Sequence, residues 1–251
     1  MIYVCIPVHD EAATVGVLMW KARRVLGEFG RDYRIVVHDD ASTDDTPAVL
    51  ERYRRKLPLT VLRSEQRLGY GRSVERLLRH VVDVAAYPKR DAAVVIQGDF
   101  TEDPEAIVSL VRVLEGGADI VAGSTGTTEH PLPRGRRVAR WLARTALAGV
   151  FRGAPVSDPL SGLRAYRLIV LKKALRDVAP HDAFVRCDGW AADVELLARL
   201  VPHARRVEEV PLSPRYDLRA RPSRFRPARA VLSLARLAGR SLWTPPRPEV
   251  A

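Results

Sequence analysis

Two stretches near the N-terminus decide the fold: IYVCIPVHDE, residues 2–11, and RIVVHDDASTDDT, residues 34–46. Each is an apolar, largely β-branched run that passes directly into acidic and hydroxyl side chains. Such a run is typical of a buried strand, and the polar residues mark its carboxyl end. Residues 12–29 between them carry apolar residues at helical spacing. The two stretches therefore predict a β–α–β unit.

The same alternation continues to residue 122. The pattern predicts further strands over residues 59–63, 92–96 and 119–122, and helices over residues 46–56, 71–84 and 104–114. This order indicates an α/β fold, a doubly wound and mostly parallel sheet flanked by helices. Ligands of such sheets bind beyond the carboxyl ends of the strands. We therefore look for the site where the strands end.

After Gly123 the alternation is less regular. The pattern predicts helices over residues 138–151 and 191–200, strands over 185–187 and 207–211, an Arg- and Pro-rich loop over 213–227, and a C-terminal helix over 228–242. We expect one domain over residues 1–226, followed by a basic amphipathic helix and tail over residues 227–251.

Composition excludes several classes of protein. The chain has 251 residues, 47% of them hydrophobic, which is enough for a sizeable core. Two cysteines, Cys5 and Cys187, exclude a disulfide scaffold and a cysteine-only zinc site, and Cys5 is expected to be a buried thiol. No apolar run is long enough to span a membrane, and no basic leader precedes the first strand, so we expect a cytoplasmic protein.

The net charge of +11 is unevenly distributed. Residues 1–130 carry 17 basic and 20 acidic side chains, whereas residues 131–152 carry six Arg and no acid, and residues 202–251 carry eleven Arg and four acids. This distribution is unlike a uniformly basic nucleic-acid-binding protein, so we expect no nucleic-acid partner. It fits either an Arg-rich composition (36 Arg against 5 Lys) or a local anionic substrate or membrane surface.

Acidic residues follow two of the predicted strands. Asp99, in the sequence Gln97-Gly98-Asp99, suits a hard divalent cation that also binds a diphosphate; the alternative is a helix cap. Asp39 and Asp40 suit hydrogen bonds to a ribose or a base; the alternative is helix capping.

Two further segments contain glycine. Gly69 and Gly71 open a helix, where backbone and helix dipole favour an anion, although a plain loop fits equally well. The segment DPLSGLR, residues 158–164, suits a ligand rich in hydroxyls and phosphates, or is an ordinary turn.

Together these motifs resemble family 2 glycosyltransferases of the GT-A fold, most closely the dolichyl- and polyprenyl-phosphate mannose synthase group. The resemblance covers roughly residues 2–226 and rests on motifs in the family's order: IPVHDE at 6–11, DDASTDDT at 39–46, GYG at 69–71, QGD at 97–99, DPLSGLR at 158–164 and VEEVP at 207–211.

The resemblance implies roles for individual residues. For the nucleotide, it implies a donor pocket lined by Pro7, Val8, Glu11, Gln97 and Gly98, a base or ribose bound by Asp39 or Asp40, and close approach at Gly69 and Gly71. For the sugar and phosphates, it implies that Ser161 and Arg164 lie beside them and that Ser223 and Arg224 belong to a phosphate-binding loop. It also implies that Arg137 or Arg224 neutralises the leaving diphosphate.

The chain departs from the family pattern at its metal motif. Asp99 stands at the second acid of the family's Asp-x-Asp motif, and Gln97 replaces the first. The resemblance implies a divalent cation, Mg²⁺ or Mn²⁺, with Asp99 and Gln97 as candidate ligands and one charge fewer than usual.

The implied reaction is inverting transfer of a sugar from a GDP- or UDP-sugar to a polyprenyl or dolichyl phosphate. One alternative is transfer to a glycan or small-molecule hydroxyl, which needs a base such as Asp158, Asp188 or Glu195. Another is a non-catalytic module that binds a sugar nucleotide. A nucleotidylyltransferase is disfavoured because residues 7–11 stand where it needs a Gly-rich loop.

A lipid acceptor implies contact with a membrane surface. Arginines between residues 134 and 140 precede the apolar pair Trp141–Leu142, and the C-terminal helix combines an apolar stripe with basic flanks. These features predict peripheral binding at the cytoplasmic face of a membrane, or two stripes that pack on the sheet.

Overall fold

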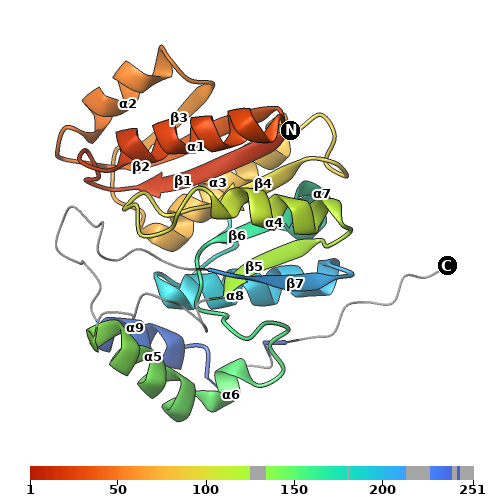
Figure 1. Cartoon of the computed structure of the whole chain (residues 1–251). Helices are drawn as coiled ribbons and strands as arrows, with labels where there is room; N and C mark the ends of the chain where they lie inside the picture. The colour runs from red at the N-terminus through yellow and green to blue at the C-terminus, as the bar shows by residue number, and fades with distance from the viewer. Residues whose placement is uncertain (125–133, 180, 213–226, 239–241, 244–251) are drawn as a thin grey trace.

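The computed structural model describes residues 1–124, 134–179, 181–212, 227–238 and 242–243 (Figure 1). Ser223, Arg224 and the predicted boundary at residue 226 lie outside these ranges.

A seven-stranded sheet runs through the molecule in the order β3-β2-β1-β4-β6-β5-β7. Its strands are β1 Ile2–Val8, β2 Tyr33–Asp40, β3 Leu59–Ser64, β4 Ala92–Val95, β5 Ile120–Ser124, β6 Arg164–Arg167 and β7 Val207–Pro211. Strand β6 is antiparallel to β4 and β5, and the other pairs are parallel. The predicted mostly parallel α/β sheet is confirmed.

The described α-helices are α1 Val15–Phe29, α2 Thr46–Arg54, α3 Tyr70–Val84, α4 Ala106–Glu115, α5 Arg134–Ala146, α6 Ala148–Phe151, α7 Leu168–Leu175, α8 Trp190–Leu200 and α9 Pro227–Ala235. Helices α1 to α4, α7 and α8 cover the two faces of the sheet (Figure 1). Side chains of β1 alternate between two apolar clusters: Val4 and Ile6 face the cluster of α1 and α4, and Tyr3 and Cys5 face that of α3, α7 and α8. Cys5 is fully buried, as predicted, and burial raises the pKa of its thiol.

A third apolar cluster joins α9 to α5 and α8. Its buried residues include Ala143 of α5, Trp190 and Val194 of α8, and Leu234 of α9. Figure 1 shows α5, α6 and α9 gathered at the end of the molecule opposite α2.

The structure corrects the sequence prediction mainly in the second half of the chain. Strand β6 and helix α7 were not predicted, because the strand has only four residues, two of them arginine. Residues 185–187 do not form the predicted strand: their backbone N–H groups bind carboxylates instead. The helix predicted over 138–151 begins at Arg134 and is interrupted at Leu147.

Candidate active site

A cleft of about 630 Å³ opens where the carboxyl ends of β1, β2 and β4 meet. It is lined by Pro7, Val8, His9, Glu11, Asp40, Arg67, Tyr70, Ser73, Gln97, Gly98 and Asp99. The structure thus brings together six of the predicted donor-site residues and Asp99. Its place in the sheet is where doubly wound folds bind ligands.

The backbone adopts unusual conformations around this cleft. Asp10, Ala41 and Phe100, each shortly after one of the three strands, have φ angles of 50°, 55° and 61°. Residues other than glycine adopt this left-handed conformation at a cost, and they do so most often at functional sites. At Gly98 a Cβ atom would come within 2.7 Å of Val8 Cγ1, so only glycine allows the two strand ends to approach.

Asp39 and Asp40 have different surroundings. Asp40 lines the cleft, and its carboxylate accepts the N–H groups of Leu68 at 2.6 Å and Gly69 at 2.9 Å. Asp39 is buried behind it, where Oδ1 accepts the N–H of Ser42 at 3.0 Å. Oδ2 of Asp39 has no hydrogen-bond partner among the described residues. Asp40 therefore shapes the loop beside the cleft.

Asp99 is buried at the cleft, and its Oδ1 accepts both the N–H and the hydroxyl of Thr101, at 3.1 and 2.6 Å. Within the described ranges, no group of three or more His, Cys, Asp or Glu side chains can hold a metal ion. One carboxylate still fits Mg²⁺ or Mn²⁺ that takes its other ligands from diphosphate oxygens and water. The amide nitrogen of Gln97 lies beside Gly162, 2.9 Å from where a Cβ would stand.

Gly69 and Gly71 make room for another part of this chain. Gly69 has a φ angle of 90°, and a Cβ atom on Gly71 would overlap the carbonyl oxygen of Cys187. The N–H of Gly71 donates to Asp188 Oδ1 at 3.1 Å. The close backbone approach expected of a nucleotide is thus made by residues 187–188.

Sequence reasoning missed a buried group under the cleft. The hydroxyl of Tyr70 donates to Asp193 Oδ1 at 2.9 Å. Burial raises the pKa of Asp193 to about 7, against the opposing effects of Arg164 and of the Tyr70 hydroxyl. An acid among the apolar residues of α8 was the only signal in the sequence.

Arg164 lies within this buried group. The resemblance placed it beside the sugar and phosphates, but it is fully buried and does not line the cleft. Its guanidinium donates to the carbonyls of Asp193 at 2.5 Å and Pro159 at 2.6 Å. The structure therefore gives it a role in holding α8 and the 158–162 turn together.

Two other predicted residues lie away from the cleft lining. Ser161 is buried, with its N–H donating to the carbonyl of Asp158 at 3.3 Å. Arg137 is exposed on α5.

The three predicted bases differ in their partners. Asp158 is paired with Arg140. Burial would raise the pKa of Glu195, but the N–H groups of residues 186 and 187, together with Arg199, lower it below its ordinary value. Asp188 is exposed and accepts the N–H of Gly71. Of the three, Asp188 is the one at the surface.

This mostly parallel sheet, with the antiparallel strand β6 between β4 and β5 and a polar cleft at the strand ends, has the GT-A fold. The same fold occurs in the crystal structure of glucosyl-3-phosphoglycerate synthase from Mycobacterium tuberculosis in complex with Mn²⁺, UDP and glucosyl-3-phosphoglycerate. That structure has a TM-score of 0.66 and 22% identity, covering 95% of this chain and 80% of the synthase. S. aureus TarS is a second example, with a TM-score of 0.56, 18% identity, and 84% and 60% of the two chains covered.

The model of glycosyl transferase family 2 matches residues 3–189, and the chain belongs to this family. Among its curated relatives is an undecaprenyl-phosphate 4-deoxy-4-formamido-L-arabinose transferase of Edwardsiella ictaluri, 26% identical, with 83% of this chain and 58% of the relative covered. Another is a dolichol-phosphate mannosyltransferase of Pyrococcus furiosus, 27% identical, covering 67% of this chain and 47% of the relative. The chain thus spans about half the length of these relatives.

Proposed function

We propose that this chain is an inverting glycosyltransferase that moves a sugar from a nucleoside-diphosphate sugar to a polyprenyl or dolichyl phosphate. The observation that carries the proposal is the cleft, in which Glu11, Asp40 and Asp99 meet at the ends of three strands of a family 2 fold. The names of two curated relatives, which include undecaprenyl phosphate and dolichol phosphate, support the acceptor class.

The donor would lie along the cleft from β2 to β4. Pro7, Val8, Glu11 and Asp40 would surround the nucleoside, because they line the half of the cleft formed by β1 and β2. The diphosphate would lie toward Asp99 at the end of β4.

Asp99 is the residue that would hold a divalent cation, which when bound offsets the charge of the leaving diphosphate. The hydrogen bonds from Thr101 fix the carboxylate of Asp99 in one orientation before substrate binds. Cation and donor would therefore bind together, as expected where phosphates complete the coordination.

The surroundings of the acids favour a phosphate acceptor. A phosphate monoester is already ionised near neutral pH, so its attack on the sugar needs positioning rather than a strong base. Asp158 and Glu195 are held by arginine and by backbone N–H groups. A hydroxyl acceptor is the second candidate, with the exposed Asp188 as base.

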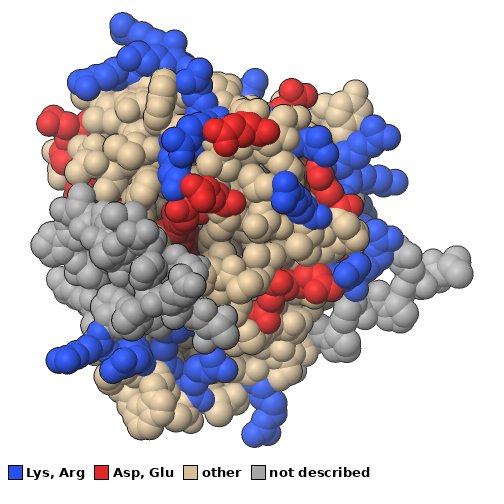
Figure 2. Space-filling model, viewed as in Figure 1, with Lys and Arg blue, Asp and Glu red and all other residues tan. Residues whose placement is uncertain are grey.

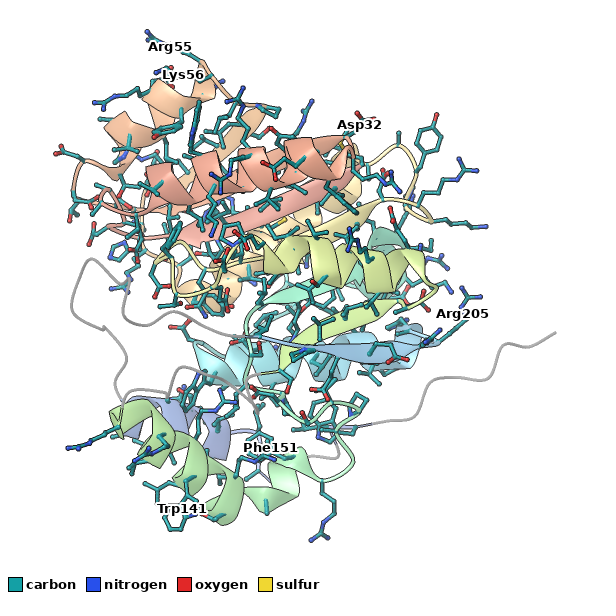
Figure 3. The ribbon with its side chains drawn as sticks, viewed as in Figure 1. Asp32, Arg55, Lys56, Trp141, Phe151 and Arg205 are labelled. Atoms are coloured by element: carbon teal, nitrogen blue, oxygen red, sulfur yellow. The ribbon has the colours of Figure 1, made fainter. Side chains whose placement is uncertain are left out.

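We also propose that helices α5 and α9 bind a membrane surface. Val138, Trp141 and Leu142 occupy one face of α5 at 54, 63 and 43% exposure, so this stripe does not pack on the sheet. Figure 3 shows Trp141 pointing away from the body of the molecule. Leu232 of α9 is 66% exposed, and Arg137 of α5 is exposed as well.

Charge at this end suits anionic lipid. Figure 2 shows basic side chains around the end where Figure 1 places α5 and α9. An apolar stripe with arginines beside it is the composition of a helix that lies in a membrane interface. Within the described ranges, none of the helices is long and apolar enough to cross a bilayer.

A transfer assay tests the proposed reaction. Purified chain is incubated with GDP- or UDP-sugars and a polyprenyl phosphate, in Mg²⁺, Mn²⁺ or EDTA. We expect a lipid-linked sugar that requires the cation and is lost in Asp99→Ala. Donor hydrolysis without lipid product would favour a hydroxyl acceptor instead of the lipid phosphate. Absence of donor binding would reject the proposal.

A further inference from the structure

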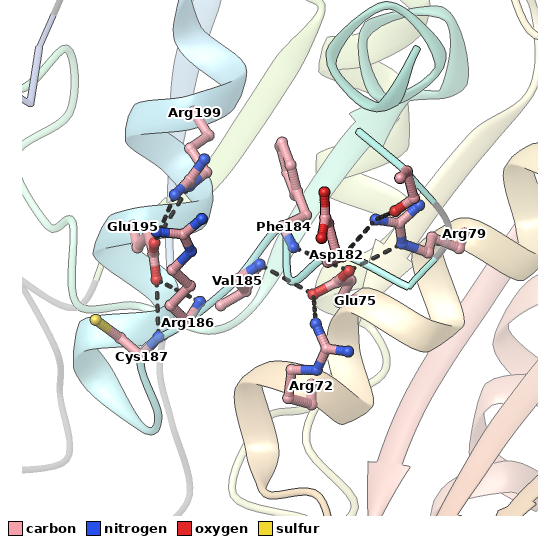
Figure 4. Close-up of polar contacts among 11 residues, drawn as sticks. Arg72, Glu75, Arg79, Asp182, Phe184, Val185, Arg186, Cys187, Glu195 and Arg199 are labelled. Carbon is pink, nitrogen blue, oxygen red and sulfur yellow. Dashed lines mark hydrogen bonds and ion pairs between the residues drawn. The ribbon is translucent and has the colours of Figure 1, made fainter. Parts of the chain in front are cut away.

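Residues 184–187 form a segment whose four backbone N–H groups all donate to two glutamates (Figure 4). Glu75 of α3 accepts from Phe184 at 3.1 Å and Val185 at 2.9 Å. Glu195 of α8 accepts from the next two residues, both at 2.8 Å. The carboxylates thus replace the hydrogen bonds that a neighbouring strand would supply.

Both glutamates are buried, with side chains only 4% exposed, and arginines balance their charge. Arg72 and Arg79 pair with Glu75 at 2.8 and 2.9 Å. Arg199 pairs with Glu195 at 3.0 Å. A buried carboxylate with several charge-assisted hydrogen bonds holds its partners in one geometry.

The segment leads directly to the loop beside the cleft. Asp188, its next residue, accepts the N–H of Gly71 at 3.1 Å, and the carbonyl of Cys187 packs against the Gly71 Cα. Between Gly69 and Gly71 stands Tyr70, which lines the cleft. The loop is held from its other side by Asp40, through the N–H of Gly69.

We propose that Glu75 and Glu195 are positioning residues for donor binding. They fix residues 184–188, and this segment in turn fixes the Gly69–Gly71 loop and the Tyr70 side chain at the cleft. Neither glutamate lines the cleft. The inference rests on the proposed function in one respect: it takes the ligand of the cleft to be a nucleoside diphosphate.

The test uses Glu75→Ala and Glu195→Ala, the two clamp variants, with Glu115→Ala as matched control. Alanine removes both carboxylate oxygens, so the N–H groups of residues 184–187 lose the acceptors that hold them. Glu115 is exposed and pairs with Arg31 on the surface, so its change should leave both readouts as in wild type.

The first readout is amide hydrogen exchange without nucleotide. Each clamp variant is expected to raise exchange about tenfold or more at residues 184–187 and also at residues 69–71, with β1 and β4 unchanged. Faster exchange at 184–187 alone would overturn the proposal, because the segment would then be uncoupled from the loop.

The second readout is the Kd for UDP and GDP with Mn²⁺, measured where each variant is folded. We expect it to rise about five- to twentyfold in both clamp variants. A purely structural role predicts a lower melting temperature with an unchanged Kd, and that result would also overturn the proposal.

Asp188→Ala covers the case in which a clamp variant fails to fold. It removes the acceptor of the Gly71 N–H and leaves both glutamates in place, so we expect a higher Kd with residues 184–187 still protected. An unchanged Kd in this variant contradicts the proposal. A wild-type chain that binds neither nucleotide would reject the proposed function instead. The exchange data would still show whether the two glutamates hold residues 184–187 and, through them, the Gly69–Gly71 loop.

Discussion

The cleft and the layer beneath it are built in opposite ways. Asp40 and Asp99 reach the cleft because Asp40 is the last residue of β2 and Asp99 follows β4 within a few residues. Beneath them, Tyr70 meets Asp193 across 123 residues of sequence, and Glu75 meets Val185 across 110. The comparison teaches that local sequence places the groups that would touch substrate, whereas long-range pairs hold them there. Variants in the two regions should therefore fail differently.

Arg164→Leu is expected to give the largest loss of stability. It leaves the buried carbonyls of Asp193 and Pro159 without their donor. A buried acceptor left without its hydrogen bond costs about 1–3 kcal/mol, and here two lose theirs together. Chemical denaturation measures it, and Arg31→Leu, at an exposed ion pair, should cost less than about 1 kcal/mol.

Asp99→Ala should lose activity but keep its stability. Its carboxylate accepts the N–H and the hydroxyl of Thr101, only two residues away, so its removal breaks a local contact and the fold should persist. Without the acid that would hold the cation, transfer should fall by about a hundredfold or more. Steady-state kinetics with a far-UV spectrum measures both. Transfer at wild-type rate would mean that the cleft acid has no part in the reaction.

Asp193 predicts a pH dependence of stability. Its pKa is about 7 in the folded chain, above the ordinary 3.8, so the folded state binds the proton more tightly than the unfolded state. The stability that this proton provides is therefore fully present below about pH 4 and is lost as pH rises to about 7. Each pKa unit by which the folded value exceeds the unfolded value adds about 1.4 kcal/mol to the free energy of unfolding at low pH. Asp193→Asn should remove this dependence.

The measurement is the free energy of unfolding of both chains between pH 4 and 8. Wild type should become less stable relative to Asp193→Asn across that interval. A constant difference between the two would show that the carboxylate titrates at its ordinary pKa.

A pair of glycine variants compares packing at the loop with packing at the surface. In Gly71→Ala the new Cβ meets the carbonyl oxygen of Cys187, and such overpacking costs about 1–3 kcal/mol. In Gly27→Ala, on the exposed side of α1, nothing lies within 4 Å of the new atom. That variant should gain up to about 1 kcal/mol. Thermal unfolding of both variants measures the contrast, which a loss in both would contradict.

The contrast between local sequence and long-range pairs also explains which parts of the structure the sequence predicts. Strand β1 and the acids at the carboxyl end of β2 and after β4 could be predicted, because a buried run and the polar residues that end it are adjacent in the chain. Strand β6 could not, since its four residues, RAYR, form a strand only between β4 and β5. The sequence predicts close approach at glycines 69 and 71, but the groups that approach them are Asp188 and Cys187, more than a hundred residues away.

The smallest expected effect concerns membrane binding by the exposed apolar side chains of α5 and α9. Trp141→Ala should weaken binding to anionic liposomes several-fold, because Trp141 is the most exposed of the large apolar side chains that the structure describes on α5. Trp20→Ala is the matched control, since Trp20 is 48% exposed on α1 instead. Liposome sedimentation at low salt measures both, and equal losses would place the binding face elsewhere.

The central claim is that the cleft at the ends of β1, β2 and β4 binds a nucleoside diphosphate together with a cation. A crystal structure with Mn²⁺ and either UDP or GDP, with Mn²⁺ located by anomalous scattering, tests it most directly. The account predicts a Mn²⁺ peak beside the Asp99 carboxylate and a nucleoside between Glu11 and Asp40. Nucleotide bound elsewhere, or Mn²⁺ away from Asp99, would contradict it.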